Sequence, residues 1–380
     1  MNAMKICYFD NNMGKYDEFN PRFVFNEPNT KDIVTILSQY PKYYFTNDKL
    51  SKRLGFTKQE YDQAMKLLDN ISAVVVDKYG RIRLNFPFFT AKDLKRITNI
   101  MNYVLKTNKR VIEANAERLN QIARKIYPNI PVHITLYHLL CGKIFDGEFF
   151  EYLTRSNLLN ISYPKNGNRD YMLIGYHDDK FCNKFNESLL CSFNNAWLGK
   201  SALTSFGTPN ERLDYFRYFK LRETGKLPTE FQQLDGLLKN FSDEEVVSGS
   251  LDIVKNLREN NVPLGDNLLE ALKITGYVSQ GNKLTVPVFD NYIEKVQLLH
   301  KEVVQIFGDY IKFYLNLVKE RVLRENILCV NHEVPVDELT NELWHIFFGQ
   351  LNNYLVEKNI VARPIKYKSQ GSYLKCVYLN

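Results

Sequence analysis

The chain has few cysteines and no long apolar run, and both absences exclude classes of protein. Its six cysteines in 380 residues include no Cys-x-x-Cys pair, so the sequence indicates neither a disulfide framework nor a common zinc motif. No apolar run approaches the ~20 residues that cross a bilayer, and residues 1–5 lack the apolar region of a secretion signal. We therefore expect a cytoplasmic protein with reduced thiols and no membrane partner.

Motifs of catalysis and cofactor binding are also missing. The sequence has no glycine-rich phosphate loop and no G-x-G-x-x-G pattern. His133, His138 and Cys141 offer ligands for a soft metal, with a further ligand needed from His177 or Cys182. Ordinary histidines and cysteines of an amphipathic helix are the simpler interpretation. The sequence thus predicts no catalytic residue, no metal and no cofactor, and a protein that is not an enzyme.

Composition and charge indicate a globular protein with one basic region. An apolar fraction of 44% and a charged fraction of 24% are ordinary for a folded protein, and 380 residues exceed a single core. The formal net charge is +7, whereas residues 42–110 alone carry fifteen cations and six anions, an excess of +9. Such an excess suits a polyanion-binding surface. A solvated lysine-rich surface is the alternative.

Three short sequences recur about two hundred residues later in one register. Their common offset predicts an internal duplication, with modules near residues 30–180 and 235–380; chance similarity is the alternative. A pseudo-two-fold monomer would match a two-fold partner such as duplex DNA. The pairs are residues 84–89 with 284–289, 152–157 with 354–359, and 171–176 with 373–378.

Residues 31–86 alternate short helical and extended patterns. Gly55 suits the left-handed position after a helix, and Thr57 with Glu60 forms a capping box that opens the next helix. A turn containing Gly80 then joins two runs rich in β-branched residues. The predicted elements are helices over residues 31–40, 47–54 and 57–70, and strands over 73–77 and 81–84.

This order of elements resembles the winged helix-turn-helix superfamily, and residues 48–61 carry the resemblance. In that superfamily the helix after the turn enters the major groove and the hairpin, or wing, lies along the backbone. The resemblance implies that residues 57–70 form the recognition helix and residues 78–81 the wing. The nucleic-acid-binding residues that it implies are Lys49, Lys52, Arg53, Lys58, Gln59, Gln63, Lys66, Lys78, Arg81 and Arg83.

Two features depart from a strongly DNA-binding pattern. The recognition helix carries Glu60, Asp62 and Asp69, which phosphate repels, and it offers no arginine for reading bases. The second module is weaker still: residues 251–260 and 264–274 would be its helices, and residues 277–284 would be a hairpin with a single cation. We interpret it as a degenerate winged helix.

A long helical pattern follows each hairpin, over residues 91–126 and 291–324. The apolar stripe of the first includes Leu94, Met101 and Val111, with Asn108 on the same stripe. We expect the two helices to pair with each other, or else with a second chain, which would permit self-association. Helices over 132–153 and 336–355 and strands over 171–176 and 373–378 complete the modules.

The sequence therefore predicts a mainly α protein with small β-hairpins, built as tandem winged-helix modules that are each followed by a long helix. The expected function is duplex DNA binding through the first module, in transcription regulation. The alternative is a non-catalytic winged-helix scaffold for protein–protein interaction. The expected segments are an extension (1–30), winged helix 1 (31–90), its long helix and tail (91–180), a connector (181–235), degenerate winged helix 2 (236–290), and its long helix and tail (291–380).

Overall fold

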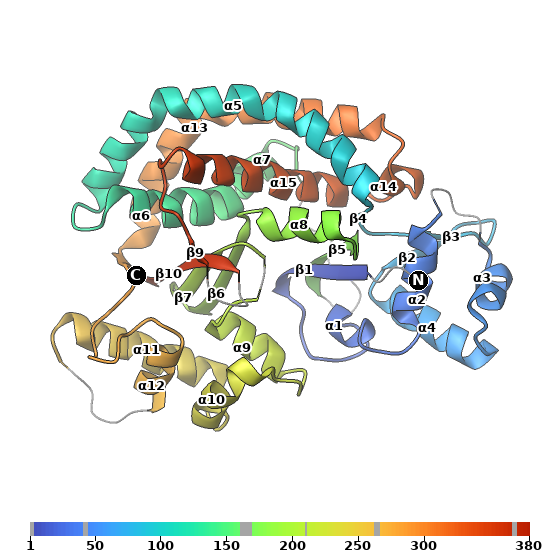
Figure 1. The fold of residues 1–380 in the computed structure, drawn as a ribbon, viewed down its shortest axis with the longest axis horizontal. Coiled ribbons are helices and arrows are strands. Elements are labelled where there is room, and N and C mark those ends of the chain that lie inside the picture. Colours follow the sequence, from blue (N-terminus) through green and yellow to red (C-terminus); the bar gives the residue numbers. More distant parts are fainter. Residues whose placement is uncertain (1–3, 41–44, 160–168, 210, 262–266, 367–370) are drawn as a thin grey trace. The chain divides into compact units, whose positions relative to one another are not determined.

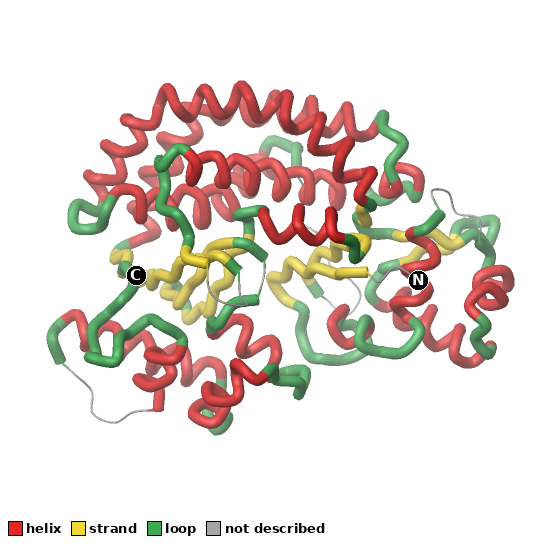
Figure 2. The backbone as a smooth tube through the Cα atoms, in the orientation of Figure 1, coloured by secondary structure: helices red, strands yellow, loops and turns green. Residues whose placement is uncertain are grey.

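The computed structural model describes residues 4–40, 45–159, 169–209, 211–261, 267–366 and 371–380. The protein is mainly helical with small sheets, and Figure 2 shows its short strands among much longer helices. The chain divides into two compact units, each assembled from separate stretches. Unit 1 comprises Met1–Asn108, Tyr152–Asn186 and Asp309–Phe347, and unit 2 comprises Lys109–Glu151, Glu187–Gly308 and Phe348–Asn380.

Three long helices contribute residues to both units. The expected helix over residues 91–126 is confirmed, and its relative in the second half begins and ends within one residue of expectation. In the first of them Leu94, Met101 and Leu119 are buried as expected, whereas at one position Ile112 is buried in place of Val111. Among the described residues, no helix is both long and apolar enough to cross a membrane. The three helices are α5 (Ala91–Ile126), α13 (Tyr292–Leu323) and α15 (Val336–Glu357).

Unit 1 contains a three-stranded sheet in the order β1-β5-β4. The strand β1 (Met4–Asn12) is antiparallel to β5 (Asp170–His177), and β4 (Phe88–Phe89) pairs with β5 in parallel. A Cβ atom at Gly175 would lie 2.2 Å from the Phe88 ring, so the close approach of β4 to β5 requires glycine. The sequence pattern does not indicate β1, which lies within the expected N-terminal extension.

Beside this sheet, residues 30–84 fold into a small head (Figure 1), whose core is continuous with Tyr171 and Leu173 of β5. We call these residues the first head. Its helices and hairpin share a core with Ile33, Leu50, Leu68 and Ile82. The head contains α2 (Thr30–Ser38), α3 (Asn47–Leu54), α4 (Lys58–Asn70), β2 (Val74–Val76) and β3 (Ile82–Leu84). The other elements of unit 1 are α1 (Pro21–Val24) and α14 (Leu328–Asn331), with most of α7 (Phe149–Arg155) and α8 (Lys180–Ser188), whose remaining residues belong to unit 2.

Unit 2 contains a larger sheet in the order β6-β7-β10-β8, with β9 also paired to β10. The strand β10 is antiparallel to β7 and parallel to β8. The hairpin β6–β7 lies in the expected connector, where the sequence pattern indicates only a helix. Asparagines in β6 hide its alternation, because asparagine is uncommon in strands. The strands are β6 (Ser192–Leu198), β7 (Ser201–Gly207), β8 (Val288–Asp290), β9 (Ile365–Lys366) and β10 (Ser372–Leu379).

The helices of unit 2 include a second head, which we define as residues 243–285. Its first helix begins eight residues before the expected start, at a second capping box, Ser242 with Glu245. Of the expected helix 264–274, residues 264–266 lie outside the described residues. The expected helix 132–153 is one helical run whose middle is a π-helix. The helices are α6 (Val132–Leu136), η1 (Tyr137–Glu148), α9 (Tyr215–Arg222), α10 (Thr229–Leu238), α11 (Asp243–Arg258) and α12 (Asn267–Ile274).

The segments that recur in the sequence occupy like positions in the two units. Each hairpin leads to a proline whose carbonyl accepts from the central strand: Gly175 N lies 2.8 Å from Pro87 O, and Val377 N lies 3.0 Å from Pro287 O. The next residues form a short parallel strand, β4 or β8, before a long helix. Asn157 and Asn359, which follow α7 and α15, both have left-handed backbones, with φ of 56° and 54°.

Candidate nucleic-acid-binding surface

The helix α3 presents three cations to solvent. Its only buried residue is Leu50, so Lys49, Lys52 and Arg53 all lie on its exposed side. Gly55 ends the helix with φ of 71°, as its left-handed C-cap. The sequence pattern alone located this helix, its bounds and its terminating glycine.

The helix α4 is fixed by its cap and by its buried side. Thr57 Oγ1 accepts from Glu60 N at 3.3 Å, and Glu60 Oε2 accepts from Thr57 N at 2.8 Å, which confirms the capping box. The Thr57 hydroxyl, which donates to Glu60 Oε2 at 2.7 Å, and the Thr57 backbone nitrogen together lower the pKa of Glu60. Tyr61 is buried and donates to Asn47 Oδ1 at 2.9 Å, which ties α4 to the start of α3. Lys58, Gln59 and Gln63 remain exposed on the other side.

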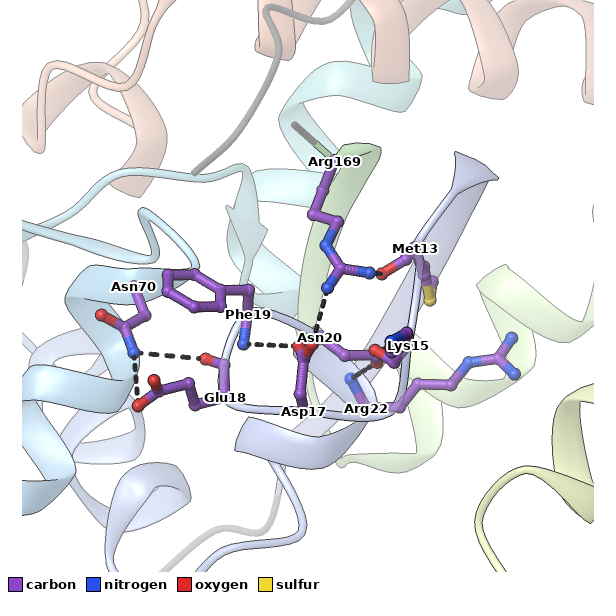
Figure 3. A network of polar contacts seen from close by, with 9 residues as sticks. All are labelled: Met13, Lys15, Asp17, Glu18, Phe19, Asn20, Arg22, Asn70 and Arg169. Atoms are coloured by element: carbon purple, nitrogen blue, oxygen red, sulfur yellow. Dashed lines mark hydrogen bonds and ion pairs between the residues drawn. The ribbon is translucent and has the colours of Figure 1, made fainter. Parts of the chain in front are cut away.

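Lys66, the other cation of α4, lies near a carboxylate. Glu18 approaches Lys66 Nζ to 3.8 Å and accepts from Asn70 Nδ2 at 3.3 Å. Figure 3 shows the loop that carries Glu18, which Arg169 holds through Asp17 at 2.7 Å and the Met13 carbonyl at 2.7 Å. This loop reduces the positive charge at the C-terminal end of α4.

The first hairpin turns around Asp77. Its Oδ1 accepts from the backbone nitrogens of Tyr79 at 2.8 Å and Arg81 at 2.9 Å, and its Oδ2 accepts from Arg81 Nε at 2.7 Å. Partial burial raises the pKa of Asp77, and the hydrogen bonds and charge of Arg81 outweigh it, so the pKa lies below its ordinary value. A bridge between Thr46 and Arg81 adds a third extended segment beside β3. Arg81 therefore organises the turn in addition to carrying charge.

Arg83 faces the fold rather than solvent. Its Nη1 donates to the carbonyls of His332 and Glu333 at 2.8 Å each, and its side chain is 19% exposed. Leu84 N donates to His332 Nδ1 at 3.0 Å, and His332 Nε2 lies 2.8 Å from Tyr40 O. Arg83 thus anchors the hairpin to the segment after α14, and we leave it out of the contact surface.

Five of the expected cations remain available to an anion. They are exposed, and none forms an ion pair with any described residue. Asp62 and Asp69 are exposed on α4, so the positive surface lies on α3, on the start of α4 and on the hairpin rather than along the length of α4. The five cations are Lys49, Lys52, Arg53, Lys58 and Lys78.

In the second head, by contrast, two cations form ion pairs with carboxylates. Arg258 Nη2 lies 2.7 Å from Asp290 Oδ2, and Lys273 Nζ lies 2.7 Å from Glu270 Oε1. Its hairpin is also shorter. The hydrogen bond at the base of the first hairpin joins Asn85 N to Ala73 O, and the one at the base of the second joins Thr285 N to Tyr277 O, so the second hairpin has four residues fewer. The exposed Lys283 is the cation of that shorter turn.

The possible metal ligands belong to other elements than α3, α4 and the first hairpin. His138 is fully buried beside the rings of Tyr137 and Phe289, and burial lowers its pKa to about 3, so it is neutral. His133 is exposed. No group of three or more His, Cys, Asp or Glu side chains that could hold a metal occurs within the described part of the chain.

Sequence reasoning missed two residues that shape this surface. Asp77 organises the turn, and a signal was present, because aspartate two residues before an extended turn commonly accepts from its backbone nitrogens. His332 supports the hairpin from about 250 residues away, and no local pattern indicates such a contact.

Comparisons with known proteins do not identify the chain. No family model, no curated protein and no solved structure matches it.

Proposed function

We propose that the protein binds duplex DNA through the first head, as a regulator of transcription. The observation that carries the proposal is the set of five exposed cations on α3, α4 and the hairpin with no carboxylate partner among the described residues. Lysine and arginine that neutralise phosphates supply most of the affinity of sequence-tolerant DNA binding. The second head, whose cations Arg258 and Lys273 are both paired with carboxylates, would have a structural role.

The order of elements supports the same proposal. Helix α2, an extended segment at Thr46, helices α3 and α4, and the hairpin β2–β3 follow one another as in a winged helix. In this proposal α3 and the hairpin contact the backbone, and Gln59 and Gln63 of α4 are the side chains nearest the base edges. The exposed acids of α4 limit how closely that helix approaches the phosphates.

We further propose that the two halves arose by duplication and exchanged parts. The first two stretches of unit 1, shifted forward by about two hundred residues, fall on two stretches of unit 2. The third stretch of unit 1, shifted backward by the same number, falls on the remaining stretch of unit 2. Each unit thus combines the head and sheet of one half with the helical segment of the other half. The matching bonds to Pro87 and Pro287 and the left-handed Asn157 and Asn359 support this interpretation.

The alternative function, a scaffold that binds protein, is favoured by one observation. Glu60, Asp62 and Asp69 lie exposed along α4, and Glu18 lies beside Lys66. An acidic helix face suits a basic protein partner better than it suits DNA. The salt dependence of DNA binding separates the two functions.

The proposal is tested by titrating the full chain with a random-sequence DNA duplex at several salt concentrations. We expect Lys49→Gln, Lys52→Gln and Lys78→Gln, made together, to weaken binding to all sequences. The slope of log affinity against log salt should flatten by about 0.9 for each phosphate that the variant no longer neutralises. Glutamine preserves helix propensity and leaves Asp77, Arg81 and Arg83 in place.

A matched control removes the same charge from unit 2. Lys226→Gln, Lys239→Gln and Lys283→Gln, made together, change three exposed lysines outside the first head, and they should leave the slope almost unchanged. Equal effects of the two triple variants, or no duplex binding by the unmodified protein at low salt, would overturn DNA binding by the first head and leave the scaffold.

A further inference from the structure

An aromatic side chain stands at the tip of the first hairpin. Tyr79 is 66% exposed and contributes almost nothing to the core. Its backbone nitrogen is fixed by Asp77, whereas its ring projects outward. Lys78 Nζ and Arg81 Cζ lie 5.0 and 4.9 Å from the ring centroid. A tyrosine held on a rigid turn between two cations is a combination that recurs where bases stack on protein.

The two cations do not block such stacking. A cation over an exposed ring is held only weakly, because water competes for its charge. When Lys78 moves to a phosphate, its interaction with the ring is exchanged for a stronger one between opposite charges. The same movement uncovers the part of the tyrosine ring that Lys78 covers, while Arg81 stays bound to Asp77 at 2.7 Å.

The rest of the surface indicates which form of nucleic acid the ring would meet. The exposed cations on α3 and Lys78 of the hairpin suit a duplex backbone, and Asp62 and Asp69 keep the middle of α4 away from one. A base inside a duplex has no free face for a side chain at the hairpin tip. An unpaired base at a duplex end has one, and stacking on it is tolerant of sequence.

We propose that the first head binds the junction between duplex DNA and an unpaired strand, with Tyr79 stacked on the first unpaired base. This inference rests on the proposed DNA binding and adds its substrate class. Lys78 and the cations of α3 contact the duplex phosphates beside the junction. The second head lacks this function, because its shorter turn carries Gly281 and Asn282 at the tip in place of an aromatic residue.

The test compares two forked duplexes of equal charge with the full chain. One carries a base at the first unpaired position and the other an abasic site there, so their phosphates are the same. We expect the intact fork to bind at least about fivefold more tightly, the factor that corresponds to about 1 kcal/mol of stacking. Tyr79→Ala should abolish this difference, and Tyr79→Phe should retain it. A 2-aminopurine at the same position should change fluorescence on binding only when residue 79 is aromatic.

The control is Tyr103→Ala, which removes a tyrosine of α5 that is 62% exposed and lies outside the first head. It should preserve the difference between the forks. Equal binding of both forks, or a difference that survives in Tyr79→Ala, overturns the junction proposal while binding to a blunt duplex keeps the proposed function intact. Failure of blunt duplex and forks alike overturns both.

Discussion

At the scale of single residues, a buried glutamate has the clearest consequence for stability. Glu342 of α15 is 2% exposed, and its Oε1 accepts from Tyr176 Oη at 2.6 Å. Its Oε2 has no hydrogen-bond donor among the described residues, and His345 Nδ1 lies 3.8 Å away. Burial raises the pKa of Glu342 from 4.5 to about 7, although the charge of His345 and the bond from Tyr176 act in the opposite direction.

This glutamate predicts a pH-dependent stability. The folded state holds the proton more tightly than the unfolded state, so this contribution is fully present below pH 4.5 and is lost as the pH rises through about 7. Glu342→Gln stays neutral, so it should unfold at higher urea concentration than the unmodified protein at pH 8. We expect a gain of up to about 3 kcal/mol there and little difference at pH 4.5.

The matched control is the exposed Glu357→Gln on the same helix, which should change stability equally and slightly at both pH values. Urea titrations at pH 4.5, 6 and 8 provide the measurement. A Glu342→Gln difference that does not vary with pH would show that folding does not raise the pKa of the buried carboxyl.

Single residues of this kind also mark the limit of sequence reasoning. Leu50, Gly55, Thr57 and Glu60 were predictable because their roles depend on neighbours within four residues. The anchoring of Arg83 was not, because the carbonyls that hold it belong to residues 332 and 333. A pattern of spacing carries no information on such distant partners.

At the scale of elements, both heads begin a helix with the same device. The side chains of Thr57 and Ser242 each accept from the backbone nitrogen three residues later, at 3.3 and 3.2 Å. In return, a glutamate side chain accepts from the backbone nitrogen of each capping residue. The elements that the sequence predicted well, α3, α4 and α5, have such local signals or a long apolar period. Those that it missed, β1 and the hairpin β6–β7, are strands whose stability comes from their neighbours in the sheet.

Removing either cap should weaken its own head by a similar amount. Thr57→Ala and Ser242→Ala each leave helix nitrogens without a partner, and each should lower the free energy of unfolding by about 1 kcal/mol. The sites share no partners, so the double variant should show the sum of the two effects. Chemical denaturation measures all three, with Thr57→Ser as the conservative control. If Thr57→Ser destabilises as much as Thr57→Ala, the capping oxygen is not the cause.

At the scale of the molecule, the chain is not a simple succession of domains. The sequence repeat predicted modules contiguous in sequence, whereas each unit gathers residues from both halves. Within unit 1, the first hairpin and β4 depend on α14 and the turn after it. Phe88 N donates to Cys329 Sγ at 3.3 Å, Cys329 donates to Phe88 O at 3.1 Å, and Leu84 N donates to His332. Periodicity along the sequence locates helices and strands, but it does not indicate the hydrogen-bond partners that a segment distant in sequence supplies.

This exchange predicts that the first half does not fold alone. A fragment of residues 1–188 retains the first head and its sheet but lacks residues 309–347, which complete unit 1. The buried nitrogens of Leu84 and Phe88 would have no acceptors, and each unsatisfied nitrogen costs about 1–3 kcal/mol. The two costs together, about 2–6 kcal/mol, reach the lower part of the 5–15 kcal/mol that holds a typical domain folded. We expect the fragment to show no cooperative urea transition by circular dichroism, and coexpression with residues 189–380 to restore one in a complex of both fragments. A sharp transition in residues 1–188 alone would contradict the dependence of the first head on the segment from the other half.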